Sequence, residues 1–350
     1  MKAGDTINGY TILEDFKVVG AGLSKWTFAE RGDRQFFIKE FLSPTYPDDA
    51  APGSLKTKAK KRARCAIFEA HHEGLRRALA PLSAYGGNLI VTLDFFRWGA
   101  KYYKVTEKVN AAGLSEADVA ALDLRTKLVL LKSVAHSLKI LHDLHIVHGD
   151  LKPSNILIKR TELGYTSKLI DFDNSYIAGS PPPPEEIVGT INYYSPELLG
   201  YIQEAGVPAS SLGVASDVFA LGLIYSQYLS GTLPAFDTVA FHEPAVAAVS
   251  GTILRMNRAG LPEVLADLVD RMLLADPASR PTTGQVHATL MAFRHAPEPT
   301  SATTSSRPVT TALRGRGLRA TPPSASATTS GPTGRLVGKL MQRLTDRKGP

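Results

Sequence analysis

The chain has 350 residues, of which 43% are hydrophobic and 21% are charged, an ordinary composition for a globular protein with a sizeable core. Its net charge of +7 comes from one end, because residues 297–350 hold nine Lys/Arg and two Asp/Glu, while the rest holds 31 of each sign. A neutral body argues against a nucleic-acid-binding domain, and one cysteine, Cys65, excludes an internal disulfide framework and a thiolate metal cluster. No apolar run reaches the length of a membrane span, and the first residues lack the apolar core of a signal peptide, so we expect a cytoplasmic location.

The first hundred residues predict short strands and one helix. Aromatic and β-branched residues, which are typical of strands, dominate the runs at 10–20, 25–31, 34–41, 88–96 and 101–109. Residues 56–79 are rich in helix formers and contain no proline, and no glycine before Gly74. We therefore expect a small antiparallel sheet that carries one helix.

After about residue 112 the pattern becomes mostly helical. Residues 124–145 place their apolar side chains on one helical face, and residues 261–277 carry a proline in the first turn and stop at another. Residues 215–231 are apolar nearly all round, which predicts a buried helix. Residues 297–350 are mainly Ser, Thr, Ala, Pro and Arg, and such a composition predicts a disordered basic tail. The apolar stripe at 335–344 is either a short docking helix or a nascent helix without a role, and we favour the second reading.

The stretch HIVHGDLKPSNILI, residues 145–158, carries the first chemical signal. Asp150 can accept the proton of a substrate hydroxyl, and Asn155 can bind a hard cation such as Mg²⁺ through its amide oxygen. Farther along, Asp171 follows an apolar run in KLIDFDNS and offers a second metal ligand. A held nucleotide, metal ions and an acid that orients a hydroxyl are the parts that phosphoryl transfer needs.

Two upstream features add a candidate nucleotide site. Gly20 and Gly22 form a turn between strands, where backbone N–H groups can approach phosphates closely. Lys39 lies inside an apolar strand, and a buried lysine requires a carboxylate partner. The predicted helix offers Glu69 and Glu73 one turn apart, and we choose Glu69 because Phe68 can anchor the helix to the sheet beside it.

In this order the motifs resemble the eukaryotic-type Ser/Thr protein kinase family over residues 10–295. The resemblance implies an α+β bilobal protein-kinase-like fold, with an antiparallel N-lobe sheet and one helix at 1–108 and a mostly helical C-lobe at 109–296. It also implies ATP and Mg²⁺ between the lobes and a protein Ser/Thr hydroxyl as acceptor, without a nucleic-acid partner or a membrane span. The Ala- and Arg-rich composition suggests a bacterial source.

The resemblance also assigns a role to individual positions. It implies the catalytic group Asp150, Lys152, Lys39 and Glu69; the ATP contacts Gly20, Ala21, Gly22, Lys25, Lys39, Thr106, Glu107 and Val109; the metal ligands Asn155 and Asp171; the substrate-positioning residue Thr190; and the structural residues Glu197, Asp217 and Arg280. HGDLKPSN, followed at this spacing by DFD and then by SPE, is the specific part of the pattern. A glycine turn or a lone strand lysine is a weak signal.

Several positions depart from the family pattern. Gly149 replaces the usual arginine that meets a phosphate on the activation segment, and Pro181–Pro184 stiffen that segment, so we expect activity without activation-segment phosphorylation. Asp173 replaces a glycine and either adds to the Mg²⁺ shell or faces solvent, and we favour solvent. Phe37 replaces a small residue beside the adenine and is expected to crowd the base unless the small Thr106 compensates.

Two other functions remain open. A pseudokinase would bind nucleotide or partners without turnover, and a small-molecule phosphotransferase of the aminoglycoside-kinase type often has glycine before the catalytic acid. Lys152, Thr190 and the Glu197–Arg280 pair favour a protein kinase over the second, and the complete set of chemical residues favours catalysis over the first. The hydroxyl-rich tail is either a target of autophosphorylation, since a tethered substrate has a high effective concentration, or only a linker.

Overall fold

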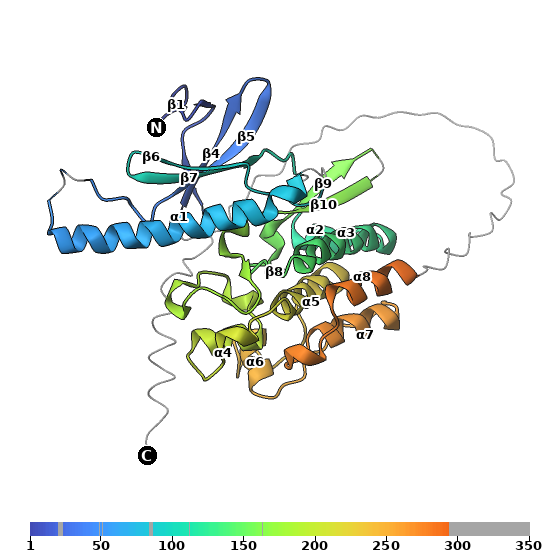
Figure 1. Ribbon diagram of the computed structural model, residues 1–350. Helices are drawn as coiled ribbons and strands as arrows, with labels where there is room; N and C mark the ends of the chain where they lie inside the picture. Colours follow the sequence, from blue (N-terminus) through green and yellow to red (C-terminus); the bar gives the residue numbers. More distant parts are fainter. Residues whose placement is uncertain are drawn as a thin grey trace, which may run out of the picture.

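A computed structural model describes residues 1–19, 24–48, 50, 52–83, 87–111, 113–162 and 164–293. It shows two lobes, one built on a sheet and one built mainly of helices, as the sequence predicts (Figure 1). The glycine turn at 20–22 and the tail at 297–350 lie outside the described residues, so the expectations for them remain predictions. None of the helices in the described part of the chain is long and apolar enough to cross a membrane.

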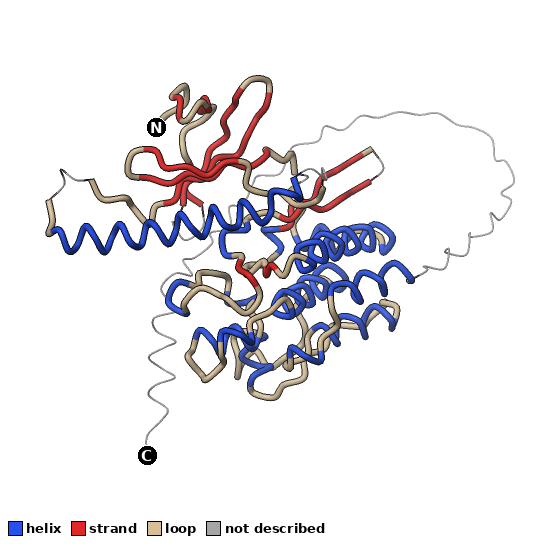
Figure 2. Tube along the Cα trace, viewed as in Figure 1, coloured by secondary structure: helices blue, strands red, loops and turns tan. Residues whose placement is uncertain are grey.

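The N-lobe strands lie together in the upper part of Figure 2, where strands are red. They form an antiparallel sheet with strand order β1-β2-β4-β5-β7-β6 and β3 paired to β4. Its strands are β1 (Thr6–Ile7), β2 (Tyr10–Ile12), β3 (Lys17–Val19), β4 (Ser24–Arg31), β5 (Arg34–Phe41), β6 (Asp94–Trp98) and β7 (Lys101–Glu107). The run at 88–96 becomes a strand only from Asp94, because Leu89, Ile90 and Val91 are buried and Leu89 bridges to Leu169, the last residue of the C-lobe strand β10. Burial between the lobes, rather than pairing in the sheet, explains the apolar character of these three residues.

Helix α1 (Leu55–Ser83) runs along the sheet, between it and the C-lobe (Figure 1). Its 29 residues include the whole predicted helix and continue past Pro81. Cys65 and Phe68 pack against Phe41 and Tyr102, which are cross-strand neighbours on β5 and β7. These apolar contacts fix the position of α1 along the sheet. They therefore decide which side chains of α1 can reach Lys39 on β5.

The C-lobe is a helical core with two small β-ladders on the side of the cleft. Its helices are α2 (Glu116–Ala121), α3 (Leu124–Asp143), α4 (Pro196–Ile202), α5 (Ala215–Ser230), α6 (Pro244–Val249), α7 (Glu263–Met272) and α8 (Thr283–Ala292); its ladders pair β8 (Ile146–Val147) with β11 (Tyr176–Ile177) and β9 (Ile156–Thr161) with β10 (Gly164–Leu169). Nearly every residue of α5 is buried, which confirms the prediction for this apolar segment. The core around α5 is closely packed and therefore rigid. The β8–β9 loop projects from this core toward the N-lobe sheet.

Candidate active site

The loop between β8 and β9 is held from below by Asp217 on α5. The Asp217 carboxylate accepts hydrogen bonds from the backbone N–H groups of His148 at 2.6 Å and Gly149 at 3.1 Å, and from His142 Nε2 at 2.9 Å. Burial alone would raise the pKa of Asp217, but the hydrogen bond and charge of His142 and the charge of His148 bring the pKa below its ordinary value. A buried carboxylate on a rigid helix therefore fixes the backbone just before Asp150.

We expect this arrangement to make stability sensitive to acid. A carboxylate whose folded pKa is depressed stabilises the fold above its unfolded pKa of about 3.9, and loses that contribution as the pH falls through the folded pKa. Thermal unfolding between pH 3 and pH 7 should therefore show a steeper fall in Tm below about pH 4 for the wild type than for Asp217→Asn. Parallel Tm curves for the two proteins would contradict a role of this ionisation in stability.

Gly149 is the one residue of this loop that needs the absence of a side chain. Its φ is +78°, a left-handed conformation, and a Cβ atom there would lie within 3.0 Å of the Asn174 carbonyl oxygen and 3.3 Å from the Tyr176 ring. Asn174 follows the DFD motif at residues 171–173, so the chain passes close to the loop at this point. The structure therefore explains why the usual arginine is missing: this backbone arrangement leaves no room for it.

The close approach at Gly149 predicts a large effect of adding a single methyl group. We expect Gly149→Ala to lower the free energy of unfolding by at least about 2 kcal/mol, because left-handed strain and a backbone clash add together. Urea unfolding should measure this against Gly260→Ala, since Gly260 also has a positive φ (+70°) but nothing within 4 Å of its added Cβ. Equal losses in both variants would mean that only backbone strain matters.

Asp150 lies at the centre of a compact polar group in the C-lobe. Its carboxylate accepts a hydrogen bond from Lys152 Nζ at 2.7 Å and one from the Thr190 backbone N–H at 3.3 Å. Lys152 Nζ also donates to the Thr190 hydroxyl at 3.0 Å, and the side-chain amide of Asn155 donates to the Asp150 carbonyl at 2.8 Å. The structure thus brings together four residues from the two ends of a segment of about forty residues.

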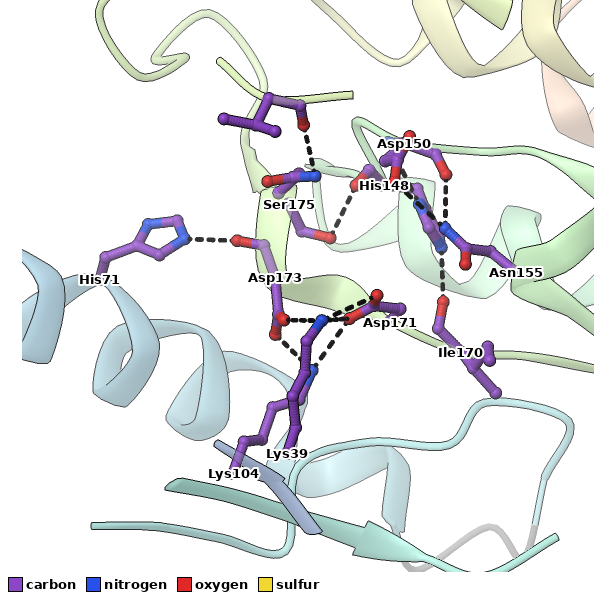
Figure 3. A network of polar contacts seen from close by, with 12 residues as sticks. Lys39, His71, Lys104, His148, Asp150, Asn155, Ile170, Asp171, Asp173 and Ser175 are labelled. Carbon is purple, nitrogen blue, oxygen red and sulfur yellow. Dashed lines mark hydrogen bonds and ion pairs between the residues drawn. The ribbon is translucent and has the colours of Figure 1, made fainter. Parts of the chain in front are cut away.

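Lys39 and Asp171 meet across the cleft, but they are part of a larger charged group (Figure 3). Lys39 Nζ lies 3.0 Å from both carboxylate oxygens of Asp171 and 2.6 Å from Asp173, and Lys104 on β7 bonds to Asp171 at 3.1 Å and also to Asp173. Two ammonium groups and two carboxylates therefore form one neutral cluster. Our prediction that Asp173 faces solvent is wrong, since its side chain is only 13% exposed and bonds to both lysines.

The predicted Lys39–Glu69 ion pair is also wrong for this conformation, because no such contact forms between these described residues. Glu69 instead accepts a hydrogen bond from the Tyr102 hydroxyl at 2.6 Å. Tyr102 is two residues from Lys104 along β7, which is roughly 7 Å at the rise of a strand. Because Lys39 is opposite Lys104, Glu69 lies too far along the sheet to contact Lys39. The alternative, Glu73, pairs with Arg76 at 2.6 Å on the helix itself.

The cleft-facing side of the sheet is unusually aromatic. Strand register puts Trp26 opposite Lys39, Phe28 opposite Phe37, and Phe37 opposite Thr106, all on the face of Lys39. The Trp26 and Phe37 rings stack with centroids 5.6 Å apart. Sequence reasoning identified Phe37 and Thr106 but missed Trp26 and Phe28, which only strand pairing brings to the same face.

Three other residues were expected to contact the nucleotide: Lys25, Glu107 and Val109. Lys25 is opposite Glu40 on β5, and Glu40 is the neighbour of Lys39. Because side chains alternate along a strand, the Lys25 side chain lies on the opposite face of the sheet from Lys39, outside the site. Glu107 ends β7 and is exposed, and the half-buried Val109 follows it in the connection to the C-lobe. These two residues therefore remain at the rear of the cleft, where the chain crosses between the lobes.

A buried ion pair joins α4 to the end of the C-lobe. Arg280 donates to both carboxylate oxygens of Glu197 at 2.8 Å and to the carbonyls of Leu274, Ala215 and Ala275 at 2.7–2.9 Å. The structure therefore contains the expected contact between Glu197 and Arg280. The pair anchors the helix that immediately follows the segment carrying Thr190.

Asn155 and Asp171 offer hard oxygen ligands. The side-chain nitrogen of Asn155 is used by the Asp150 carbonyl, which leaves its amide oxygen for a cation, and the Asp171 carboxylate is 32% exposed. Carboxylate and amide oxygens are ligands that suit Mg²⁺, which binds few protein groups and takes its other ligands from phosphates and water. The residues present therefore fit a divalent cation bound together with a nucleotide.

Comparison with known proteins agrees with this geometry. The family model for the protein kinase domain matches residues 60–291. The chain is 31% identical over 232 residues to a serine/threonine-protein kinase, pkn2, of Myxococcus xanthus, covering 59% of this chain and 26% of that protein. It is 28% identical over 213 residues to myosin light chain kinase A of Dictyostelium discoideum, covering 55% of this chain and 64% of that protein. The chain spans only about a quarter of the length of the Myxococcus protein.

Lys104 is the charged residue that sequence reasoning missed altogether. It occupies an inward position in KYYKVTE, where strand alternation with the buried Tyr102 and Thr106 marks it as facing the same side as they do. The signal was present, because a lysine at such a position needs a carboxylate just as Lys39 does. No motif drew attention to it, and its partner Asp173 had been assigned to solvent.

Proposed function

The chain belongs to the protein kinase family, and we propose that it transfers the γ-phosphoryl group of ATP to serine or threonine hydroxyls of protein substrates. One observation carries this proposal: Lys152 bridges the Asp150 carboxylate and the Thr190 hydroxyl, at 2.7 Å and 3.0 Å. An acid held beside the end of the activation segment is placed to orient an acceptor hydroxyl that this segment presents.

In this mechanism each residue acts mainly by position and charge. Asp150 accepts the proton of the acceptor hydroxyl, while Lys152 holds Asp150 in place and offers positive charge to the transferred group. Lys39 binds nucleotide phosphates from the sheet side of the cleft. Asp171 and Asn155 would hold Mg²⁺, which supplies charge neutralisation at the phosphates when bound.

The alternatives are less well supported by the same contacts. A pseudokinase would not need Asp150, Lys152 and Asn155 to be bonded in one group, yet all three are. A small-molecule phosphotransferase would not need a threonine of an extended segment bonded to the catalytic loop, as Thr190 is. Both observations favour turnover with a protein acceptor.

We further propose that activity does not depend on phosphorylation of the activation segment. Protein contacts take the place of the missing phosphate-binding arginine: Asn174 Nδ2 donates to the Val188 carbonyl at 2.7 Å, and the Tyr201 hydroxyl donates to the Pro182 carbonyl at 3.2 Å. Pairing of β11 with β8 holds the start of the segment. The proline run is extended at Pro183 and ends in a tight turn that begins at Pro184.

The test is incubation of the purified full-length chain with Mg²⁺ and γ-labelled ATP, with and without a generic basic acceptor protein, followed by mapping of the labelled residues. We expect label on serine and threonine, and the same rate after phosphatase treatment and removal of the phosphatase. Label on a small molecule alone would contradict the protein acceptor, and loss of activity after dephosphorylation, with phosphosites mapped to 171–190, would contradict the second proposal. The same map decides whether the tail is an autophosphorylation target.

A further inference from the structure

Lys39 and Lys104 stand directly opposite each other on neighbouring strands. The register pairs their Cα positions on β5 and β7, and both side chains point toward the C-lobe (Figure 3). Like charges directly opposite one another destabilise a sheet, and the Lys104 side chain is only 4% exposed, so water screens it little. A nearby carboxylate must therefore compensate the buried charge of Lys104.

Asp173 supplies that carboxylate. It bonds to Lys104 and, at 2.6 Å, to Lys39, and its backbone carbonyl lies 3.1 Å from His71 Nε2 on α1. The Asp173 side chain is only 13% exposed, and its carboxylate contacts the ammonium groups of both Lys104 and Lys39. Unlike Asp171, which has a φ of +62°, Asp173 has no positive φ that would call for glycine.

The charge balance of the cleft depends on this additional pair. Lys39 and Asp171 alone would be neutral, and so is the cluster of four; removal of either added partner leaves a net charge of one unit among buried groups. Without Lys104, a single lysine would face two carboxylates and be less available to an anionic ligand. The Glu69 carboxylate does not compensate the lysine charges of this cluster, because it is bonded to the Tyr102 hydroxyl.

We propose that Lys104 and Asp173 are a positioning ion pair of the nucleotide cleft, in which Lys104 neutralises Asp173 and so leaves Lys39 and Asp171 available to phosphates and metal. The pair also ties the metal-binding motif directly to the sheet, and to α1 through His71. This inference rests on the proposed function for its role in nucleotide binding, whereas the coupling between the two residues is independent of it.

A double-mutant cycle on the full chain tests the pair in the absence of nucleotide. We expect Lys104→Met and Asp173→Asn each to lower Tm by about 5–10 °C, because each leaves a buried charge without its main partner. The double variant should lose at least about 4 °C less than the sum of the two singles. Lys101→Met is the matched control on the same strand, since Lys101 Nζ bonds to the Leu42 carbonyl and Thr45 and, among the described residues, to no carboxylate. Additive losses would overturn the pairing.

Binding of Mg²⁺-ATP, measured by calorimetry well below Tm, separates positioning from mere stability. We expect Lys104→Met to raise the dissociation constant about tenfold, Lys104→Arg to restore most of the affinity, and the double variant to return within about threefold of the wild type. An unchanged dissociation constant in Lys104→Met would overturn the positioning role. If the wild type binds Mg²⁺-ATP and the cycle shows coupling, but no label is transferred, the proposed function fails and the ion pair stands.

Discussion

Asp150→Asn is expected to lower the rate of phosphoryl transfer by about 10²–10⁴-fold, because the amide cannot accept the proton of the acceptor hydroxyl. Asparagine keeps the size of the side chain and can still accept the hydrogen bond from Lys152. The affinity for Mg²⁺-ATP should therefore stay within about threefold of the wild type, since Asp150 bonds to Lys152 and Thr190 on the acceptor side of the cleft. Label transfer and calorimetry on the same preparations measure the two quantities.

The matched control for this variant is Asp143→Asn. Asp143 is an exposed acid at the end of α3 that, within the described part of the chain, pairs with Lys139, one helical turn away. Its loss should leave transfer unchanged, because surface pairs of this kind contribute little. Full activity in Asp150→Asn would remove the proposed catalytic role, whereas equal loss of binding and transfer would point to damage of the site as a whole.

Arg280→Met is expected to have the largest effect on stability, a loss of about 3–5 kcal/mol in the free energy of unfolding. The substitution leaves the Glu197 carboxylate buried without its partner, and it also removes the hydrogen bonds to three backbone carbonyls. Packing cannot replace these bonds, although the methionine would still lie near the Phe219 ring that the guanidinium now covers at 5.0 Å. Urea unfolding followed by circular dichroism measures the loss.

An exposed ion pair provides the comparison for this prediction. Lys139 is 39% exposed and its ion pair in the described structure is with Asp143, so Lys139→Met should cost no more than about 0.5 kcal/mol. A similar small loss in Arg280→Met would mean that the C-lobe tolerates a buried lone carboxylate, against the expectation from burial. Retention of stability together with loss of transfer would instead place Arg280 in positioning of the segment that carries Thr190.

The catalytic-loop chemistry was readable from the sequence because its residues are close together along the chain. Asp150, Lys152 and Asn155 lie within six positions, and the backbone between two short strands holds such near neighbours together with little help. The burial of α5 was also predictable, since an all-round apolar helix must be buried. The pairing of Arg280 with Glu197 was implied by the resemblance to protein kinases. These predictions needed patterns of residue type and spacing, but no knowledge of strand register.

What only the tertiary structure decided was the partner of each charge across the cleft. The sequence offered Glu69 and Glu73 as partners of Lys39, but packing of α1 against Phe41 and Tyr102 places Glu69 beside Tyr102, two residues along β7 from Lys104. Lys39 is bonded to Asp171 and Asp173 instead. Register between β5 and β7 put Lys104 beside Lys39, although 65 positions separate them in the chain. The amino-acid sequence by itself determined which charges the cleft contains, whereas the docking of helix, sheet and C-lobe determined which of them touch, because Coulomb attraction between buried groups acts only at distances that packing sets.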